Sequence, residues 1–220
     1  MAGVIFDLDG VLIDSEELQY RAYQQVLAEF GVSVTREVYG REWIAAGRGA
    51  EYAVATYALP VSPAELRARK QPVYHHILRE EVELMPGVRP ALERLAKSYR
   101  LAVATNSNRA DVGYVVQRFQ LHPFFHAVIT REDYPGAKPE PDAFVTAAEA
   151  LGLPPSQCVV IEDSHRGLLA AKRAGAPCIA VPNEFTASHD FTTAQARIGS
   201  LQELTVELVA EALRTAKASS

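Results

Sequence analysis

The most informative residues of the 220-residue sequence are acids that directly follow short, continuously apolar runs. Asp7 and Asp9 follow one such run near the start of the chain, and Glu162 and Asp163 follow another. Acids at the ends of buried segments need partners, because an isolated buried charge is costly. An ionised carboxylate can attack phosphorus, and two carboxylates from different strands can share Mg²⁺, which prefers oxygen ligands. This pattern suits phosphoryl chemistry assisted by a divalent cation.

Other polar groups follow the remaining apolar runs. Thr105-Asn106-Ser107 follows one run directly, and Lys138-Pro139 lies beyond another, across a loop. Lysine and hydroxyl groups stabilise phosphoryl oxygens, and a second carboxylate near a nucleophile can protonate the leaving oxygen and later activate water. Each motif alone is weak; the Thr-Asn-Ser segment, for example, is also a plausible helix cap. Their joint placement favours a single phosphate site.

The elements that must bring these groups together are strands buried on both faces. Continuous apolar runs without alternation are typical of such strands. Five are present: Gly3–Phe6, Leu101–Ala104, Ala127–Ile129, Val159–Ile161 and Cys178–Val181. Patterns with apolar residues three and four apart lie between later runs and predict helices. The alternation predicts an α/β fold whose parallel sheet has right-handed crossovers and binds ligands at the carboxyl ends of its strands.

One long stretch after the first strand breaks this alternation. It contains successive helical patterns and no convincing strand. Ser15 is a predicted N-cap, followed by Glu16 in the first helical turn, and a capping box with proline at the first helical position opens a later helix at Ser62. We therefore expect a helical domain over residues 15–84, inserted into a core domain of residues 1–14 and 85–220.

Composition narrows the class of partner. The net charge of −5, from 22 basic and 27 acidic residues, argues against a dedicated nucleic-acid binder. No apolar run approaches the ~20 residues of a membrane helix, and the acids at positions 7 and 9 argue against a secretory signal. The two cysteines, Cys158 and Cys178, lie in apolar runs and are expected to be reduced. We expect a cytoplasmic protein, monomeric or weakly dimeric, with a small-molecule substrate and no membrane partner.

Four segments resemble the motifs of the haloacid dehalogenase-like hydrolase superfamily. They are Asp7-Leu8-Asp9-Gly10-Val11-Leu12, Thr105-Asn106-Ser107, Lys138-Pro139 and Ile161-Glu162-Asp163-Ser164-His165-Arg166-Gly167. The inserted helices resemble the branch with an α-helical cap, which includes β-phosphoglucomutase and sugar-phosphate phosphatases. The similarity spans nearly the whole chain and implies a Rossmann-like core, Mg²⁺ as cofactor and a small phosphate ester as substrate.

The resemblance also implies a role for each motif residue. Asp7 would be the phosphorylated nucleophile and Asp9 the general acid and base. Mg²⁺ would be held by Asp7, the main-chain carbonyl of Asp9 and Asp163, with Glu162 in or next to the coordination shell. The phosphoryl group would be bound by Thr105, Asn106 and Lys138.

Ester hydrolysis is the activity that the sequence favours. Family members that act on haloacids lack the second acid of the first motif, so Asp9 disfavours dehalogenation. A β-phosphoglucomutase-like phosphomutase is the alternative, weakened because Gln19 and Asn108 stand where the mutases have histidine and tend to have lysine. A phospho-acceptor signalling module is a remote alternative, because such modules are about half this length.

Three residues of the inserted helices are candidate substrate contacts. Arg48 is flanked by Gly47 and Gly49, so it could approach an anion closely, and its position resembles that of the arginine that binds the distal phosphate in β-phosphoglucomutase. Lys70 falls near a substrate lysine of that family, and Glu16 could hydrogen-bond a sugar hydroxyl. The competing interpretations are that Arg48 and Lys70 are solvated charges and that Glu16 complements a helix dipole.

Overall fold

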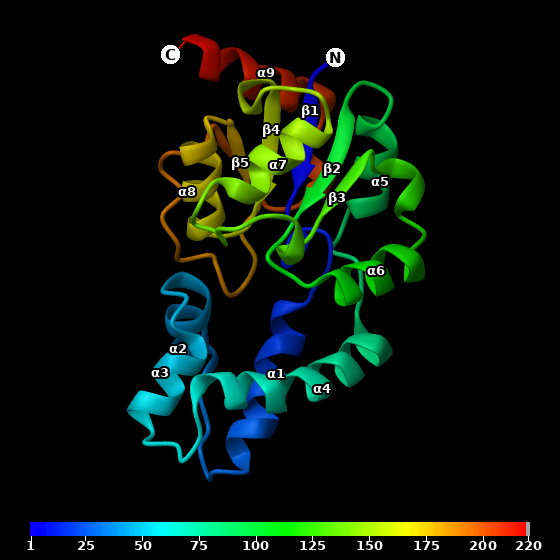
Figure 1. Ribbon diagram of the computed structural model, residues 1–220. Coiled ribbons are helices and arrows are strands. Elements are labelled where there is room, and N and C mark those ends of the chain that lie inside the picture. Colours follow the sequence, from blue (N-terminus) through cyan, green and yellow to red (C-terminus); the bar gives the residue numbers. More distant parts are fainter. Residues whose placement is uncertain (219–220) are drawn as a thin grey trace.

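In the computed structural model, which describes residues 1–218, six parallel strands form one sheet in the order β3-β2-β1-β4-β5-β6 (Figure 1). The strands are β1 (Gly3–Phe6), β2 (Arg100–Ala104), β3 (Ala127–Ile129), β4 (Cys158–Glu162), β5 (Cys178–Ala180) and β6 (Ala196–Arg197). The predicted α/β class with a parallel sheet is confirmed. The two-residue strand β6 was not predicted, because so short a strand has no apolar run of its own.

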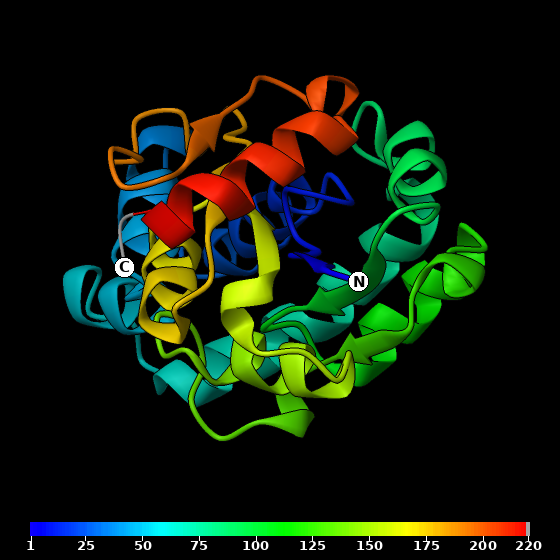
Figure 2. The same ribbon diagram turned by 90° about the horizontal axis from the view of Figure 1, so that it is seen from above.

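Helices cover both faces of the sheet (Figures 1 and 2). One face packs against α5 (Val88–Leu95), α6 (Arg109–Arg118) and α9 (Val206–Ala218). The other packs against α7 (Asp142–Ala150) and α8 (His165–Ala174). Successive strand residues alternate between the two hydrophobic clusters, which explains why the strands are apolar throughout. Short 3₁₀ turns lie at His122–Phe124, Arg131–Asp133, Pro155–Gln157 and Leu201–Glu203.

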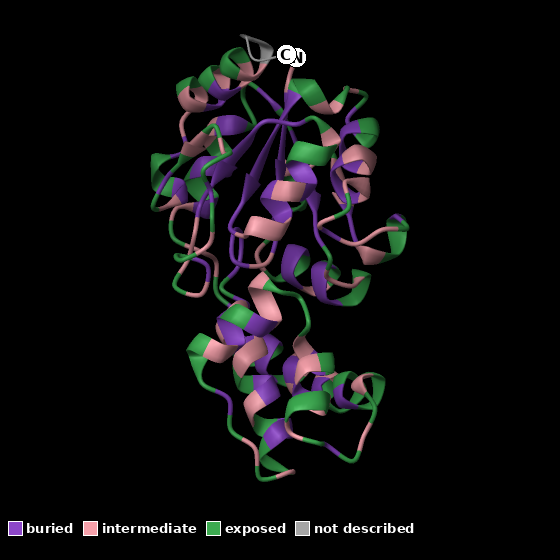
Figure 3. Ribbon diagram, turned by 90° about the vertical axis from the view of Figure 1, so that its left-hand side faces the viewer, coloured by how far each residue is buried: buried purple, intermediate pink, exposed green. Residues whose placement is uncertain are grey.

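A second group of helices lies beyond the carboxyl ends of the strands (Figures 1 and 3). It comprises α1 (Glu16–Ala28), α2 (Arg36–Tyr39), α3 (Gly49–Thr56) and α4 (Pro63–Glu81), with a π-helical segment at Gly40–Ala45. These helices share a separate hydrophobic cluster. The segments that join them to the sheet run side by side, since the backbone N–H of Asp14 donates to the Glu83 carbonyl at 3.1 Å and that of Met85 to the Leu12 carbonyl at 3.0 Å. We refer to this group as the helical cap.

The predicted capping box at the start of α4 is present. The Ser62 hydroxyl accepts from the Glu65 N–H at 3.2 Å, and the Glu65 carboxylate accepts from the Ser62 N–H at 2.7 Å. None of the described helices is long and apolar enough to span a membrane.

Candidate active site

A cavity of about 300 Å³ lies between the carboxyl ends of the strands and the helical cap. Its core side carries the predicted motif residues, and its cap side carries Glu16. Its full lining is Asp7, Asp9, Glu16, Gln19, Tyr39, Trp43, Ile44, Thr105, Asn106, Ser107, Lys138, Glu162, Asp163, Ser164 and Arg166. The four sequence motifs therefore meet in one place, although up to 156 residues separate Asp7 from Asp163 along the chain.

The sheet register places Asp7 beside Glu162. β1 pairs with β4 so that Phe6 lies opposite Ile161, and the Asp7 N–H donates to the Ile161 carbonyl at 2.9 Å. Both acids are buried, and Lys138 lies between them, with Nζ 2.6 Å from Oδ1 of Asp7 and 2.9 Å from Oε1 of Glu162. The lysine ammonium also lies 4.5 Å from the centre of the Phe144 ring. This buried ion triad fixes the end of the Asp7 side chain.

Burial and neighbouring charge set the proton affinities of these groups. The pKa of Asp7 is raised to about 8, chiefly by burial and to a smaller extent by Glu162 and Asp9, although Lys138 acts in the opposite direction. Burial also raises the pKa of Asp163, and its acidic neighbours Glu162 and Asp7 add to the effect. For Lys138, burial favours the neutral form, but Asp7 and Glu162 outweigh it, so its pKa lies above the ordinary value. The site thus holds more negative charge than its one lysine neutralises.

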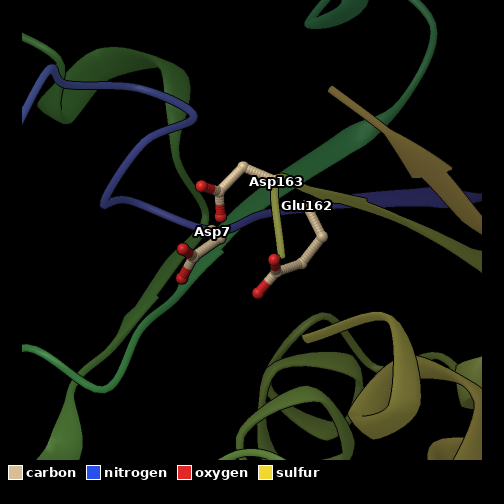
Figure 4. Close-up of side chains that lie close together, drawn as sticks. All are labelled: Asp7, Glu162 and Asp163. Carbon is tan, nitrogen blue, oxygen red and sulfur yellow. The ribbon is translucent and has the colours of Figure 1, made fainter. Parts of the chain in front are cut away.

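The carboxylates of Asp7, Glu162 and Asp163 are grouped closely enough to hold a metal ion (Figure 4). Each offers an oxygen within 4.8 Å of the others. Both Glu162 oxygens already accept hydrogen bonds, one from Lys138 and the other from the N–H and hydroxyl of Ser164 at 2.8 and 2.9 Å. Within residues 1–218, by contrast, no hydrogen bond reaches Oδ2 of Asp7 or Oδ1 of Asp163. This set of hard oxygen donors fits a divalent cation such as Mg²⁺, which Asp7 and Asp163 could hold, whereas Glu162 is directed at Lys138 and Ser164.

The turn into α8 explains the spacing of the fourth motif. Ser164 caps the helix, since its hydroxyl accepts from the Gly167 N–H at 3.1 Å, and its own N–H binds Glu162. A Cβ atom at position 167 would lie 1.7 Å from Oε1 of Glu162. Only glycine therefore lets α8 start directly over the glutamate.

Asp9 lies two residues beyond Asp7, and three hydroxyls hold its carboxylate. Ser15 donates to Oδ1 at 2.6 Å, whereas Ser107 and Thr105 donate to Oδ2 at 2.6 and 3.1 Å. Ser15 was predicted to cap α1, but its side chain makes no capping bond and serves Asp9 instead. Ser107, for which a helix cap was the alternative interpretation, also contacts Asp9, and Asn108 is the residue that caps α6. Three donors keep the Asp9 side chain at the cavity wall.

The predicted phosphate-binding residues lie together at the ends of β2 and the loop after β3. Asn106 links the end of β2 to the loop after β3. Its Oδ1 accepts from the Lys138 N–H at 3.2 Å and from the Tyr134 hydroxyl at 2.8 Å. Thr105 is fully buried and contacts Asp9. Within the described part of the chain, the Asn106 amide nitrogen makes no hydrogen bond, which leaves a donor facing the cavity. Tyr134 was not predicted, since an isolated tyrosine in a loop carries no signal of its contacts.

Glu16 is the predicted cap residue that the structure brings into the cavity. Its Oε2 accepts from the Tyr39 hydroxyl at 3.3 Å. Burial raises its pKa to about 7, with a further contribution from Asp9 and an opposing effect from Tyr39 and Lys70. Near neutral pH the carboxyl group exists in both protonation states, so it can accept or donate a hydrogen bond to a substrate hydroxyl. This geometry is compatible with the predicted role.

Lys70 and Arg48 do not line the cavity. Lys70 is buried behind it, hydrogen-bonded to Gln19, with its ammonium 4.5 Å from the centre of the Tyr74 ring. Burial lowers the pKa of Lys70 to about 8. Arg48 is 62% exposed and pairs with Glu42. The adjacent Gly47 lies against Arg166 of the core.

Arg166 is a cavity residue that sequence reasoning did not single out. It lies in the first turn of α8, half-buried, and its guanidinium donates to the main-chain carbonyl of Lys138 at 2.5 Å. The guanidinium also packs against Gly47, where a Cβ atom would lie 1.8 Å from Nη1. Gly47 has φ +62°, a conformation that favours glycine. Arg166 therefore joins the cap loop to the Lys138 loop.

Comparisons with known proteins agree with this geometry. A family model for haloacid dehalogenase-like hydrolases matches residues 4–181. Hexitol phosphatase B of Escherichia coli (strain K12) is 35% identical over 213 residues, covering 92% of this chain and 94% of that protein. Fructose-1-phosphate phosphatase YqaB of the same strain is 30% identical over 190 residues, covering 82% and 96%. A crystal structure of mutant CbbY from Rhodobacter sphaeroides with xylulose-(1,5)bisphosphate has a TM-score of 0.82 and 28% identity, covering 95% of this chain and 99% of that one.

Proposed function

Because the chain belongs to the haloacid dehalogenase-like hydrolase family, we propose that it is a Mg²⁺-dependent phosphatase that hydrolyses a small sugar or polyol phosphate. The observation that carries the proposal is the position of Asp7. One of its oxygens is bound to Lys138, and its carboxylate lies in the same cluster of acids as that of Asp163. The names of the relatives support the substrate class, since two of them are phosphatases of hexitol and fructose phosphates.

Asp7 is the proposed nucleophile. A carboxylate oxygen of Asp7 attacks phosphorus, the bond from phosphorus to the ester oxygen breaks, and an aspartyl-phosphate forms. Asp9 gives its proton to the departing alkoxide. In the second step Asp9 takes a proton from water, the resulting hydroxide attacks phosphorus, and Asp7 is released with inorganic phosphate. The hydroxyls of Ser15, Ser107 and Thr105 hold Asp9 in reach of both steps.

The remaining motif residues are proposed to bind the phosphoryl group and the cation. A divalent cation held by Asp7, the Asp9 carbonyl and Asp163 would offset the repulsion between the anionic nucleophile and the phosphate. Lys138 and Asn106 donate to the phosphoryl oxygens. Thr105 would join them only by exchanging its hydrogen bond with Asp9 for one with the phosphoryl group. Glu162 keeps the lysine ammonium beside Asp7. Since Glu162 has both oxygens occupied by Lys138 and Ser164, we place it next to the coordination shell rather than in it.

We propose that residues 15–84 act as a cap that excludes water and selects the leaving group. Glu16 would bind a substrate hydroxyl. Lys70 would act through Gln19, whose side chain lines the cavity. Arg48 would contact the substrate only after a rearrangement of the cap loop that carries it.

A panel of sugar and polyol phosphates, incubated with Mg²⁺ and assayed for both inorganic phosphate and isomerised product, tests the proposal. We expect stoichiometric phosphate from at least one polyol or hexose phosphate and no isomer from a hexose 1-phosphate. Accumulation of isomer that depends on a sugar bisphosphate would establish the mutase instead. Stable self-phosphorylation without turnover of any ester would contradict both enzymes.

A further inference from the structure

Asn183, in the turn after β5, makes the hydrogen bond that positions Asp163. Its Nδ2 donates to Oδ2 of Asp163 at 2.7 Å, on the carboxylate oxygen opposite to the one left for a cation. Gly10 lies against the same pair, with φ +76°, and a Cβ atom there would be 2.4 Å from Oδ2 of Asp163 and 2.6 Å from Nδ2 of Asn183. The amide and the carboxylate are therefore packed against the backbone of the first motif.

The oxygen of the Asn183 side-chain amide also makes hydrogen bonds. Its Oδ1 accepts from the Phe185 N–H at 2.9 Å and from the Thr186 hydroxyl at 3.3 Å. The Thr186 hydroxyl in turn accepts from the Asn183 N–H at 3.0 Å, and Thr186 is fully buried. An asparagine whose side chain closes its own turn has little rotational freedom. The direction of Nδ2 is thus fixed by the turn and not by Asp163 alone.

Phe185 attaches the same turn to the helical cap. Its ring centre lies 5.8 Å from that of Tyr39 and 6.3 Å from that of Tyr20, and it packs against the hydrophobic cluster of the cap. Tyr39 lines the cavity and donates to Glu16. The turn is therefore held on one side by its hydrogen bond to Asp163 and on the other by the packing of Phe185 against the cap.

We propose that Asn183 is a positioning residue for the divalent-cation site. It holds Oδ2 of Asp163 so that Oδ1 faces Asp7, while Phe185 keeps the turn seated. The proposal rests on the proposed function, because it assigns Asn183 to the cation site of that enzyme. Asp163 is buried beside two other acids, and a fixed donor on its far oxygen opposes the rotation that would separate the carboxylates. Partners that orient metal ligands in this way change metal affinity by about 10- to 100-fold when removed.

Isothermal titration of Mg²⁺ into the full-length protein, without substrate, tests the assignment. Asn183→Leu removes the donor to Asp163 with little change of side-chain volume. Thr186→Val is the matched control, because it removes the two hydrogen bonds between the Thr186 hydroxyl and Asn183 and leaves the Asn183–Asp163 contact in place. We expect Asn183→Leu to weaken Mg²⁺ binding by about 10- to 100-fold and Thr186→Val by less than about threefold. Thermal unfolding followed by circular dichroism identifies variants that remain folded, and Asn183→Ala replaces the leucine variant if the latter does not fold.

The outcomes separate three cases. Equal losses in both variants would show that Asn183 only maintains the turn, which overturns the assignment. Wild-type affinity in Asn183→Leu would overturn it as well, while leaving the proposed phosphatase intact if the wild type binds Mg²⁺ and releases phosphate. Absence of Mg²⁺ binding to the wild type would contradict the proposed function itself.

Discussion

The two walls of the cavity are built on different physical principles. On the core side, charged groups are buried and paired, as in the contacts of Lys138 with Asp7 and Glu162, and each follows a strand or its adjoining loop. On the cap side, Glu16 is the acid that lines the cavity, and its neighbours are aromatic or amide side chains. The charged cap residues Arg48 and Lys70 make their contacts elsewhere. In the proposed enzyme, the groups at the strand ends would carry the reaction chemistry, and the cap would offer mainly shape and hydroxyl recognition.

The side chains of the core wall are held in place more firmly than those of the cap wall. The hydrogen bonds of a parallel sheet fix the spacing and the register of neighbouring strands. They therefore also fix the relative positions of the residues that follow each strand. The cap wall depends on how helices pack on one another and on the core. Substitutions on the core side should therefore abolish the reaction, whereas substitutions on the cap side should shift KM.

Replacing the proposed nucleophile should give the largest effect. Asp7→Asn keeps the shape of the side chain but removes the attacking charge, so we expect kcat to fall by about 10⁴-fold or more. The fold should persist, because Asn also relieves the burial cost of a carboxylate whose pKa is raised to about 8. Steady-state phosphate release and circular dichroism measure the two effects. Asp14→Asn, at an exposed acid of the adjoining linker, is the matched control and should retain activity; undiminished turnover by Asp7→Asn would refute the nucleophile.

Asp9→Asn should separate the two chemical steps. With an alkyl phosphate, loss of the proton donor should lower kcat by about 10²- to 10⁴-fold. With p-nitrophenyl phosphate the leaving group needs no proton, so the first step should continue and the phosphorylated protein should accumulate. A burst of p-nitrophenolate equal to the enzyme concentration, followed by slow turnover, is the expected record in stopped flow. Equal losses on both substrates without a burst would remove Asp9 from acid–base catalysis.

Mg²⁺ affinity should depend on pH because protons compete for the same carboxylates. The pKa of Asp7 is raised to about 8, so the group is protonated at lower pH, and Mg²⁺ binding must release that proton. Affinity should therefore rise from pH 6 to at least pH 8, by up to about tenfold per pH unit for each proton released, since the pKa of Asp163 is raised as well. Titration calorimetry in buffers of different ionisation enthalpy counts the protons released. The slope should be shallower in Asp7→Asn, and a flat affinity from pH 6 to 9 in the wild type would contradict the argument.

The residues of the core wall could be predicted from the sequence because strand pairing fixes where the residues after each strand lie. Once the strands are identified, Asp7, Thr105 and Glu162 must lie together at the carboxyl ends of neighbouring parallel strands. What it does not reveal are contacts made across turns, such as Asn183 with Asp163, or Ser15 with Asp9. Ser15 has the residue type of a helix cap, and only the folded chain shows that its hydroxyl is used by another acid. The direction of Arg48 was equally hidden, because its ion pair with Glu42, six residues earlier in the chain, is seen only in the folded cap.

The contact between Gly47 and Arg166 provides a test of how the cap sits on the core. Gly47→Ala places a methyl group on the Arg166 guanidinium, so the cap loop should be displaced and KM should rise by about tenfold. Gly31→Ala is the matched control, since Gly31 has φ +71° and nothing within 4 Å of the added atom. Both variants bear the strain of a positive φ, but the control should keep its KM. Gly47→Ala should raise KM less in an Arg166→Ala background than in the wild type; an equal increase in both backgrounds would show that backbone strain alone is responsible.

Arg48→Ala should have the smallest effect and decides between the two predicted roles of this arginine. Its side chain is largely exposed and pairs with Glu42, and exposed ion pairs contribute only about 0–1 kcal/mol. If Arg48 faces solvent during turnover as well, KM should change by less than about threefold, whereas Glu16→Ala should raise KM by about tenfold because it removes a hydrogen-bonding group from the cavity wall. If Arg48 instead turns inward to hold a remote anionic group, KM should rise selectively for bisphosphates and not for neutral polyol phosphates. Kinetics on one matched pair of such substrates therefore tests whether the cap wall recognises charge or hydroxyl groups.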